Sequence, residues 1–125
     1  MSQAPVTDLI PFVHVADIER SVIFYGLLGM EADACFEQDG WLLWCSMRSR
    51  QAQIMLTLAG EPIDPAQQAI LFYLYTDDLQ ILRDELIEAG VSAGPIEDGT
   101  PGPKREMRVA DPDGYVLMVA ENGRP

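Results

Sequence analysis

The residues of this sequence that could do chemistry are few. They are a single histidine, His14, and a Glu106–Arg108 pair that we expect near two strand tyrosines, Tyr73 and Tyr75. A carboxylate or a neutral imidazole can act as a general base, and a guanidinium can stabilise negative charge as it develops. The same groups can also bind a ligand without reaction, because tyrosine rings stack and a carboxylate attracts a cation. These residues therefore admit either an enzyme or a binding protein.

Each of these residues also has a purely structural interpretation. His14 lies in an apolar strand, where a histidine can be a hydrogen-bonded core residue. Glu106 and Arg108 can form an internal ion pair or face the solvent. Strand aromatics such as Trp44 are commonly part of the core. Only the convergence of these side chains in one cavity favours a functional role.

The cysteines offer little for metal chemistry. Cys35 and Cys45 stand ten residues apart, and the chain has one histidine to assist them. A structural zinc site needs about four clustered Cys or His ligands. In the absence of an export signal we expect no disulfide either. Both cysteines are predicted to be small apolar residues within strands.

Composition excludes several classes of partner. The chain has 125 residues, of which 48% are apolar and 22% charged, as in one globular domain. Its net charge of −12 repels phosphate backbones and anionic lipid, so we expect neither nucleic acid nor a membrane surface as a partner. A cationic ligand would be attracted. With no secretory leader and no apolar run near the roughly 18 residues of a membrane span, a cytoplasmic location is expected.

An internal repeat predicts the elements that position these residues. Each repeat has a short apolar strand, an aspartate, an amphipathic stretch and a glycine. In the first repeat Asp17 precedes the stretch that ends at Gly29, and in the second Asp77 and Asp78 precede the stretch that ends at Gly90. Aspartate accepts hydrogen bonds from the first turn of a helix, and glycine permits the left-handed residue after its end. Each amphipathic stretch is therefore predicted to be a helix with one buried face.

Three short apolar segments follow each predicted helix, and Asp39-Gly40 marks a hairpin between the first two. The predicted order is β-α-β-β-β, twice, which is an α+β fold. Module one spans about 7–60, a linker spans 61–68 and module two spans about 69–121. Two such modules could enclose a cavity between concave mixed sheets. The six strands predicted after the helices are residues 30–36, 41–47, 53–58, 91–96, 105–110 and 115–120.

The arrangement resembles the vicinal-oxygen-chelate superfamily, which groups glyoxalases, bleomycin-resistance-type binding proteins and extradiol dioxygenases. The resemblance rests on residues 15–29, VADIERSVIFYGLLG, and on residues 109–115, VADPDGY. It extends over about residues 7–121. It implies a glyoxalase/bleomycin-resistance-type fold, and it also implies a homodimer, since members of this superfamily often pair.

The metal enzymes of that superfamily place four His, Gln or Glu ligands on inner strands. Carried over by local spacing, these positions are Ile10, Leu56 or its neighbour Met55, Leu71 and Met118. All of them are apolar, and neither an alkyl chain nor a thioether replaces the nitrogen and oxygen donors that catalytic divalent ions require. The resemblance therefore points to the metal-free, bleomycin-resistance-like members, and we expect no metal and no cofactor.

Strand parity predicts which side chains line the cavity, because residues two apart share a face. The segment 111–114, DPDG, suits a type I turn followed by a glycine bulge. That turn places Arg108 opposite Met118 and Glu106 opposite Ala120, so that both charged side chains point inward. A two-residue turn would instead place them outside.

The expected function is binding of a small, partly aromatic or cationic molecule in an apolar cavity. The alternative is an enzyme of lyase, isomerase or dioxygenase type, either metal-free with Glu106 or His14 as general base or with a displaced metal site. The predicted ligand-binding residues are Phe12, His14, Trp44, Leu56, Tyr73, Tyr75, Glu106, Arg108 and Met118.

Overall fold

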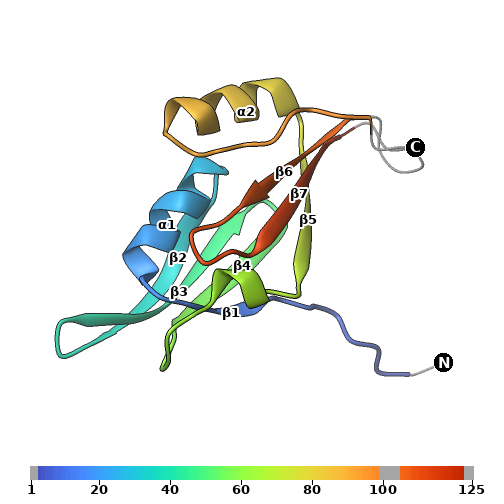
Figure 1. Cartoon of the computed structure of the whole chain (residues 1–125). Coiled ribbons are helices and arrows are strands. Elements are labelled where there is room, and N and C mark those ends of the chain that lie inside the picture. Colours follow the sequence, from blue (N-terminus) through green and yellow to red (C-terminus); the bar gives the residue numbers. More distant parts are fainter. Residues whose placement is uncertain (1–2, 99–104, 123–125) are drawn as a thin grey trace. The chain divides into compact units, whose positions relative to one another are not determined.

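The computed structural model describes residues 3–98 and 105–122 (Figure 1). Contacts along the chain divide it into two compact units, Met1–Pro62 and Ile63–Pro125. Each unit has its own sheet and its own helix, which confirms the predicted α+β class. Neither helix, nor any other helix of the described residues, has the length and hydropathy needed to cross a membrane.

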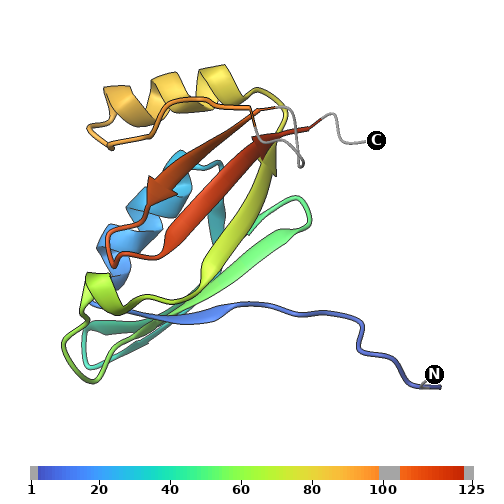
Figure 2. The ribbon, with the colours of Figure 1, turned by 45° about the vertical axis from the view of Figure 1, so that its right-hand side comes forward.

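The first unit has the predicted β-α-β-β-β order. Its strands pair in the order β1-β4-β3-β2, with β1 parallel to β4 and the other pairs antiparallel. Figures 1 and 2 show α1 lying across one face of this sheet. Its elements are β1 (Phe12–Val15), α1 (Ile18–Leu27), β2 (Glu31–Gln38), β3 (Trp41–Ser49) and β4 (Ala52–Leu58).

The predicted signals begin and end α1. The Asp17 side chain accepts a 3.1 Å hydrogen bond from the Arg20 N–H, and Gly29 follows the helix with φ of 85°. The helix buries one face against the sheet, with Ile18 and Tyr25 each 2% exposed. The buried apolar residues of the sheet are Val13, Val15, Cys45, Met47, Ile54 and Leu56. Alternate strand positions therefore form the core of this unit, and the positions between them lie on the face that α1 does not cover.

The Asp39-Gly40 hairpin is confirmed. These two residues connect β2 to β3 and have φ of 53° and 80°. Positive φ at both central residues matches the right-handed twist of the flanking strands, and glycine adopts it without a steric penalty.

The cysteines lie in strands as predicted, but the prediction that they form no disulfide was wrong. Cys35 on β2 and Cys45 on β3 are directly opposite each other, with their Cα atoms 4.1 Å apart, and they form a disulfide. The sequence argument considered only the cellular compartment. It missed that an antiparallel hairpin places directly opposed residues with their Cβ atoms within disulfide range.

The second unit has a three-stranded sheet in the order β5-β7-β6. β5 is parallel to β7, and β6 is antiparallel to β7. Asp78 begins α2 by accepting a 3.0 Å hydrogen bond from the Ile81 N–H, and the fully buried Leu79 and Leu86 form the inner side of the helix. The elements are a short 3-10 helix (Pro65–Gln67), β5 (Leu71–Thr76), α2 (Leu79–Glu88), β6 (Glu106–Ala110) and β7 (Val116–Glu121).

The predicted strand at 91–96 is not formed. Only two isolated bridges occur in this region, Ala93 with Val109 and Glu97 with Glu106. Pro95 has no N–H to donate to a ladder, and the preceding Gly94 makes a 2.9 Å backbone hydrogen bond to the Arg108 carbonyl. A proline inside the segment therefore leaves separate contacts in place of a continuous strand.

The turn between β6 and β7 confirms the predicted register. Asp111 Oδ1 accepts 2.9 Å hydrogen bonds from the N–H groups of Asp113 and Tyr115, and Gly114 has φ of 87°. Arg108 pairs with Met118, and Glu106 pairs with Ala120.

Candidate functional site

Five of the nine predicted residues share the face of the second sheet that α2 does not cover. One row across the strands is Tyr73, Met118 and Arg108. The next row is Tyr75, Ala120 and Glu106. The positions between them, which include Leu117 and Val119, are buried on the α2 side. We call Tyr73, Tyr75, Glu106, Arg108 and Met118 the tyrosine face.

A short hydrogen bond organises this face. The Tyr73 hydroxyl donates to Glu106 Oε2 at 2.6 Å, from β5 to β6 across the intervening strand β7. The β7 residue opposite Glu106 is Ala120, whose methyl group leaves room for the carboxylate to reach over. The pKa of Tyr73 is raised to about 12, mainly by this hydrogen bond and to a smaller extent by desolvation. Tyr73 is therefore a neutral phenol across the physiological range.

The two tyrosine rings form an aromatic surface beside these charges. The ring centroids of Tyr73 and Tyr75 are 5.6 Å apart, with 50° between the ring planes. Tyr73 is 44% exposed, and Arg108 is also exposed. The tyrosine face thus combines aromatic rings that can stack, a carboxylate fixed by a phenol and an exposed guanidinium.

Three further predicted residues lie on the uncovered face of the first sheet. His14 and Trp44 both pair with Thr57, and Trp44 also pairs with Phe36. Phe12 lies in the adjacent row. Phe36 is not among the predicted ligand-binding residues. Its pairing with Trp44 in the β2–β3 hairpin is what places it on this face.

Leu56, the remaining predicted residue, lies on the opposite face of the first sheet. It pairs with Val13 in the core and is 0% exposed. Its neighbour Met55 pairs with Phe12 on the uncovered face. Of the two positions that the spacing allowed, Met55 is therefore the one that a ligand on this face could touch.

A polar network that the sequence analysis missed lies beside these aromatic residues. Arg48 donates from Nε to Asp33 Oδ2 at 3.0 Å and from Nη2 to Gln53 Oε1 at 2.7 Å. Gln53 in turn donates to Ser46 Oγ at 2.8 Å. The hydrogen bond from Arg48 lowers the pKa of Asp33. Asp33 lies at a bulge of β2, which simple strand alternation does not reveal.

Side chains suited to metal binding do not gather in the described part of the chain. Across residues 3–98 and 105–122, no group of three or more His, Cys, Asp or Glu side chains could hold an ion. The apolar Met55, Leu71 and Met118 occupy three of the positions carried over from metal enzymes.

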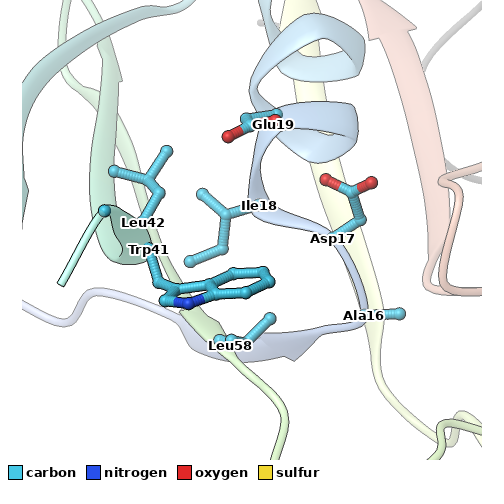
Figure 3. Close-up of a pocket in the computed structure, with 8 residues that line it drawn as sticks. Ala16, Asp17, Ile18, Glu19, Trp41, Leu42 and Leu58 are labelled. Carbon is cyan, nitrogen blue, oxygen red and sulfur yellow. The ribbon is translucent and has the colours of Figure 1, made fainter. Parts of the chain in front are cut away.

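Figure 3 shows a pocket on the helix-covered side of the first sheet, at the N-terminal end of α1. Its volume is about 320 Å³. In the sequence, Asp17 is recognisable as the residue that begins a helix and Trp41 as a strand residue, and neither signal indicates a pocket. Trp41 is the first residue of β3, and the register shift that leaves Leu43 unpaired lies between it and the buried Cys45, so strand alternation in the sequence does not reveal the side to which the indole points. The pocket is lined by Ala16, Asp17, Ile18, Glu19, Gly40, Trp41, Leu42 and Leu58.

Comparison with protein families finds one match over most of the chain. Residues 9–119 match the model described as Glyoxalase/Bleomycin resistance protein/Dioxygenase superfamily. Comparison with curated protein sequences gives no significant match.

Solved structures share the fold. A bleomycin-binding protein in complex with bleomycin superposes with a TM-score of 0.74 at 18% identity, over 94% of this chain and 99% of that one. A bleomycin resistance determinant encoded on the transposon Tn5 gives 0.73 at 18% identity, over 94% and 99%. TnmS3, an antibiotic binding protein from Streptomyces sp. CB03234, gives 0.72 at 24% identity, over 96% and 98%. At these identities the likeness shows a common fold.

Proposed function

Because the chain belongs to the glyoxalase/bleomycin resistance protein/dioxygenase superfamily, we propose that it is a metal-free protein that binds a small, partly aromatic or cationic molecule. The observation that carries this proposal is the tyrosine face, where Tyr73 and Tyr75 lie beside Glu106 and Arg108 on an uncovered sheet surface.

The chemistry of this face favours binding over proton abstraction. Glu106 Oε2 accepts the 2.6 Å hydrogen bond of the Tyr73 hydroxyl, so this oxygen is already engaged within the protein and not positioned to take a proton from a substrate. The same hydrogen bond holds the carboxylate over the sheet, where it can pair with a ligand cation. The net charge of −12 adds a long-range attraction for such a cation.

The solved structures support the class of ligand that we propose, but they do not identify the ligand. One of them is a bleomycin-binding protein in complex with bleomycin, and TnmS3 is an antibiotic binding protein. For this chain we propose an organic small molecule that can stack on a phenol ring and present a positive group to Glu106.

Isothermal titration calorimetry with bleomycin and a panel of aromatic amines tests the proposal. Glu106→Gln removes the charge and should weaken binding by about 1–3 kcal/mol, the range for a lost charged hydrogen bond. Glu88→Gln makes the same change on exposed α2 and should leave affinity unchanged. Equal affinities for both variants and the parent chain, or no saturable binding by any compound, would refute the proposal.

A loss of folding must be separated from a loss of binding. Thermal unfolding of Glu106→Gln should stay close to that of the parent chain, because Gln keeps an acceptor for the Tyr73 hydroxyl. A large fall in melting temperature with intact affinity would instead assign Glu106 a structural role.

We also propose that the protein is a homodimer. Large side chains remain exposed on the uncovered face of the first sheet, with Phe12 at 55% and Phe36 at 54%, and apolar surface of this kind favours association. Light scattering should give about twice the 13.8 kDa mass of the chain. A mass near 13.8 kDa at a protein concentration on the order of tens of micromolar would contradict the proposed dimer.

A cytoplasmic location is the remaining part of the proposal. In a reducing cytoplasm Cys35 and Cys45 would be thiols, and the disulfide would form on oxidation. Acid quenching of the cells, followed by denaturation and alkylation so that the buried Cys45 is accessible, should therefore modify both cysteines. Complete protection of both from alkylation would instead indicate an oxidising compartment.

A further inference from the structure

The pocket at the start of α1 shares no residue with the tyrosine face, because every residue that lines it belongs to the first unit. It also lies on the opposite side of its own sheet from Phe12, His14 and Trp44. Ile18 at its base belongs to the helix that covers that side. The pocket therefore needs an explanation of its own.

Trp41 is the dominant side chain of this pocket. It follows the Asp39-Gly40 turn and is 70% exposed, which is unusual for the largest apolar side chain. Figure 3 shows its indole ring beside Ile18 and Leu58, with Leu42 on the β3 side. Ile18 is 2% exposed, so it forms a rigid apolar base. An indole ring of this kind offers a broad face for an apolar or cationic group.

The charges around this ring have one sign. Asp17 and Glu19 line the pocket at the start of α1, where Figure 3 shows their carboxylates well apart from each other, and none of the eight lining residues is basic. Asp17 Oδ1 accepts the Arg20 N–H at 3.1 Å, which holds that carboxylate in position. Two carboxylates next to an aromatic face disfavour an anion and attract a cation.

We propose that this pocket binds an organic cation, a protonated or quaternary amine that carries an aromatic or alkyl group. The apolar group contacts Trp41, Ile18 and Leu58, and the ammonium lies between the indole face and the carboxylates. The volume of about 320 Å³ lies at the lower end of the roughly 300–1,000 Å³ range of small-molecule pockets, so the pocket suits a small ligand. The inference goes beyond the proposed function, since neither Glu106 nor the tyrosine rings take part.

Nuclear magnetic resonance of the full chain tests this site with benzyltrimethylammonium, benzyl alcohol and benzoate as probes. The chain has two tryptophans, so each indole N–H gives a resonance of its own, and Trp41→Phe assigns them. The Trp41 resonance should shift saturably with the ammonium compound, with a dissociation constant on the order of a millimolar. Benzyl alcohol should shift it more weakly, benzoate should not, and Trp44 should stay unshifted.

Variants identify the contributing groups. Trp41→Leu and Glu19→Gln should each weaken binding of benzyltrimethylammonium by about two- to five-fold, the range for a partly exposed cation–π or charge contact. For Trp41→Leu the shifts of α1 backbone amides report the binding. Glu85→Gln on exposed α2 is the matched charge control and should have no effect, and neither should Glu106→Gln.

Three results would overturn the site. They are the absence of a saturable shift with the ammonium compound, equal shifts with all three probes, and concentration-dependent broadening of Trp41 without a probe. The last of these would show that a second copy of the chain covers the indole.

Discussion

The hydroxyl of Tyr73 and the carboxylate of Glu106 meet at 2.6 Å although a whole strand lies between their own strands. The bond is possible because Ala120 is the β7 residue opposite Glu106, so no large side chain obstructs the carboxylate. It connects both edge strands of the second sheet on one face. A single protonation equilibrium, that of Tyr73, therefore reports whether this face is intact.

Tyr73 should titrate later than an ordinary tyrosine. Its pKa is raised from 10.0 to about 12, first by the hydrogen bond to Glu106 and then by desolvation. In an ultraviolet titration of phenolate, the difference between the parent chain and Tyr73→Phe should therefore be a single group that titrates near pH 12. Glu106→Gln should bring this group back toward the ordinary pKa, and Tyr73→Phe should remove it. A Tyr73 group that still titrates near pH 12 in Glu106→Gln, identified as the part of the titration that Tyr73→Phe removes from that variant, would contradict the assignment.

The same shift predicts how stability depends on pH. A raised pKa in the folded state means that the contribution of Tyr73 is complete below pH 10.0 and is lost as pH rises toward about 12. The melting temperature of the parent chain should exceed that of Tyr73→Phe near neutral pH, and the difference should shrink in this alkaline window. A difference that grows above pH 10.0 would reverse the predicted sign.

Gly114→Ala should destabilise the protein more than Gly40→Ala. Both glycines have positive φ, 87° and 80°, so an alanine at either is strained by about 1–2 kcal/mol. At Gly114 a Cβ atom would also lie 2.6 Å from backbone atoms of Pro65, whereas at Gly40 it meets open space. Urea denaturation should show a cost for Gly114→Ala that is larger by about 1–3 kcal/mol. Equal costs would mean that the Pro65 segment moves away freely.

Reduction of the disulfide should lower the free energy of unfolding by about 2–3 kcal/mol, since the bond closes a loop with a sequence separation of 10. Urea denaturation with and without a dithiol measures this difference. The double variant Cys35→Ala, Cys45→Ala is the control and should not respond to the dithiol. An equal response of both proteins would show that the dithiol acts elsewhere.

Leu56→Ala should reduce stability without changing ligand affinity. Leu56 is fully buried on the α1 side, so its truncation should cost about 2–5 kcal/mol. The adjacent Met55→Ala, on the uncovered face, should cost less because Met55 is only half-buried. A change in affinity for Leu56→Ala at a temperature where the variant is fully folded would place Leu56 at the ligand.

Local chemistry explains which predictions succeeded. Asp17 and Asp78 begin the two helices with their own side chains, so the helix starts follow from a few neighbouring residues. The register that places Glu106 opposite Ala120 is similarly determined by the turn around Asp111, within five residues of the charged pair, whereas the position of Tyr73 also depends on the parallel pairing of β5 with β7. Structural features that depend on the few residues of one turn can therefore be predicted from the sequence alone.

The unsuccessful predictions involve pairings that one segment does not specify. The disulfide depends on Cys35 and Cys45 being directly opposite in a hairpin with two register shifts. The pocket depends on β3 starting beside the first turn of α1, which brings Trp41 to Ile18. The alternation of apolar residues placed Leu56 in a strand but did not decide between its two faces.

The division of the chain into two units affects how it folds during synthesis. Every strand pairing of the first unit lies between Phe12 and Leu58, and none of them involves a residue of the second unit. On the ribosome, the β2–β3–β4 hairpins can form as soon as they emerge, and the parallel pairing of β1 with β4 completes the sheet. The nascent chain can therefore finish its first sheet while the residues of the second are still being added.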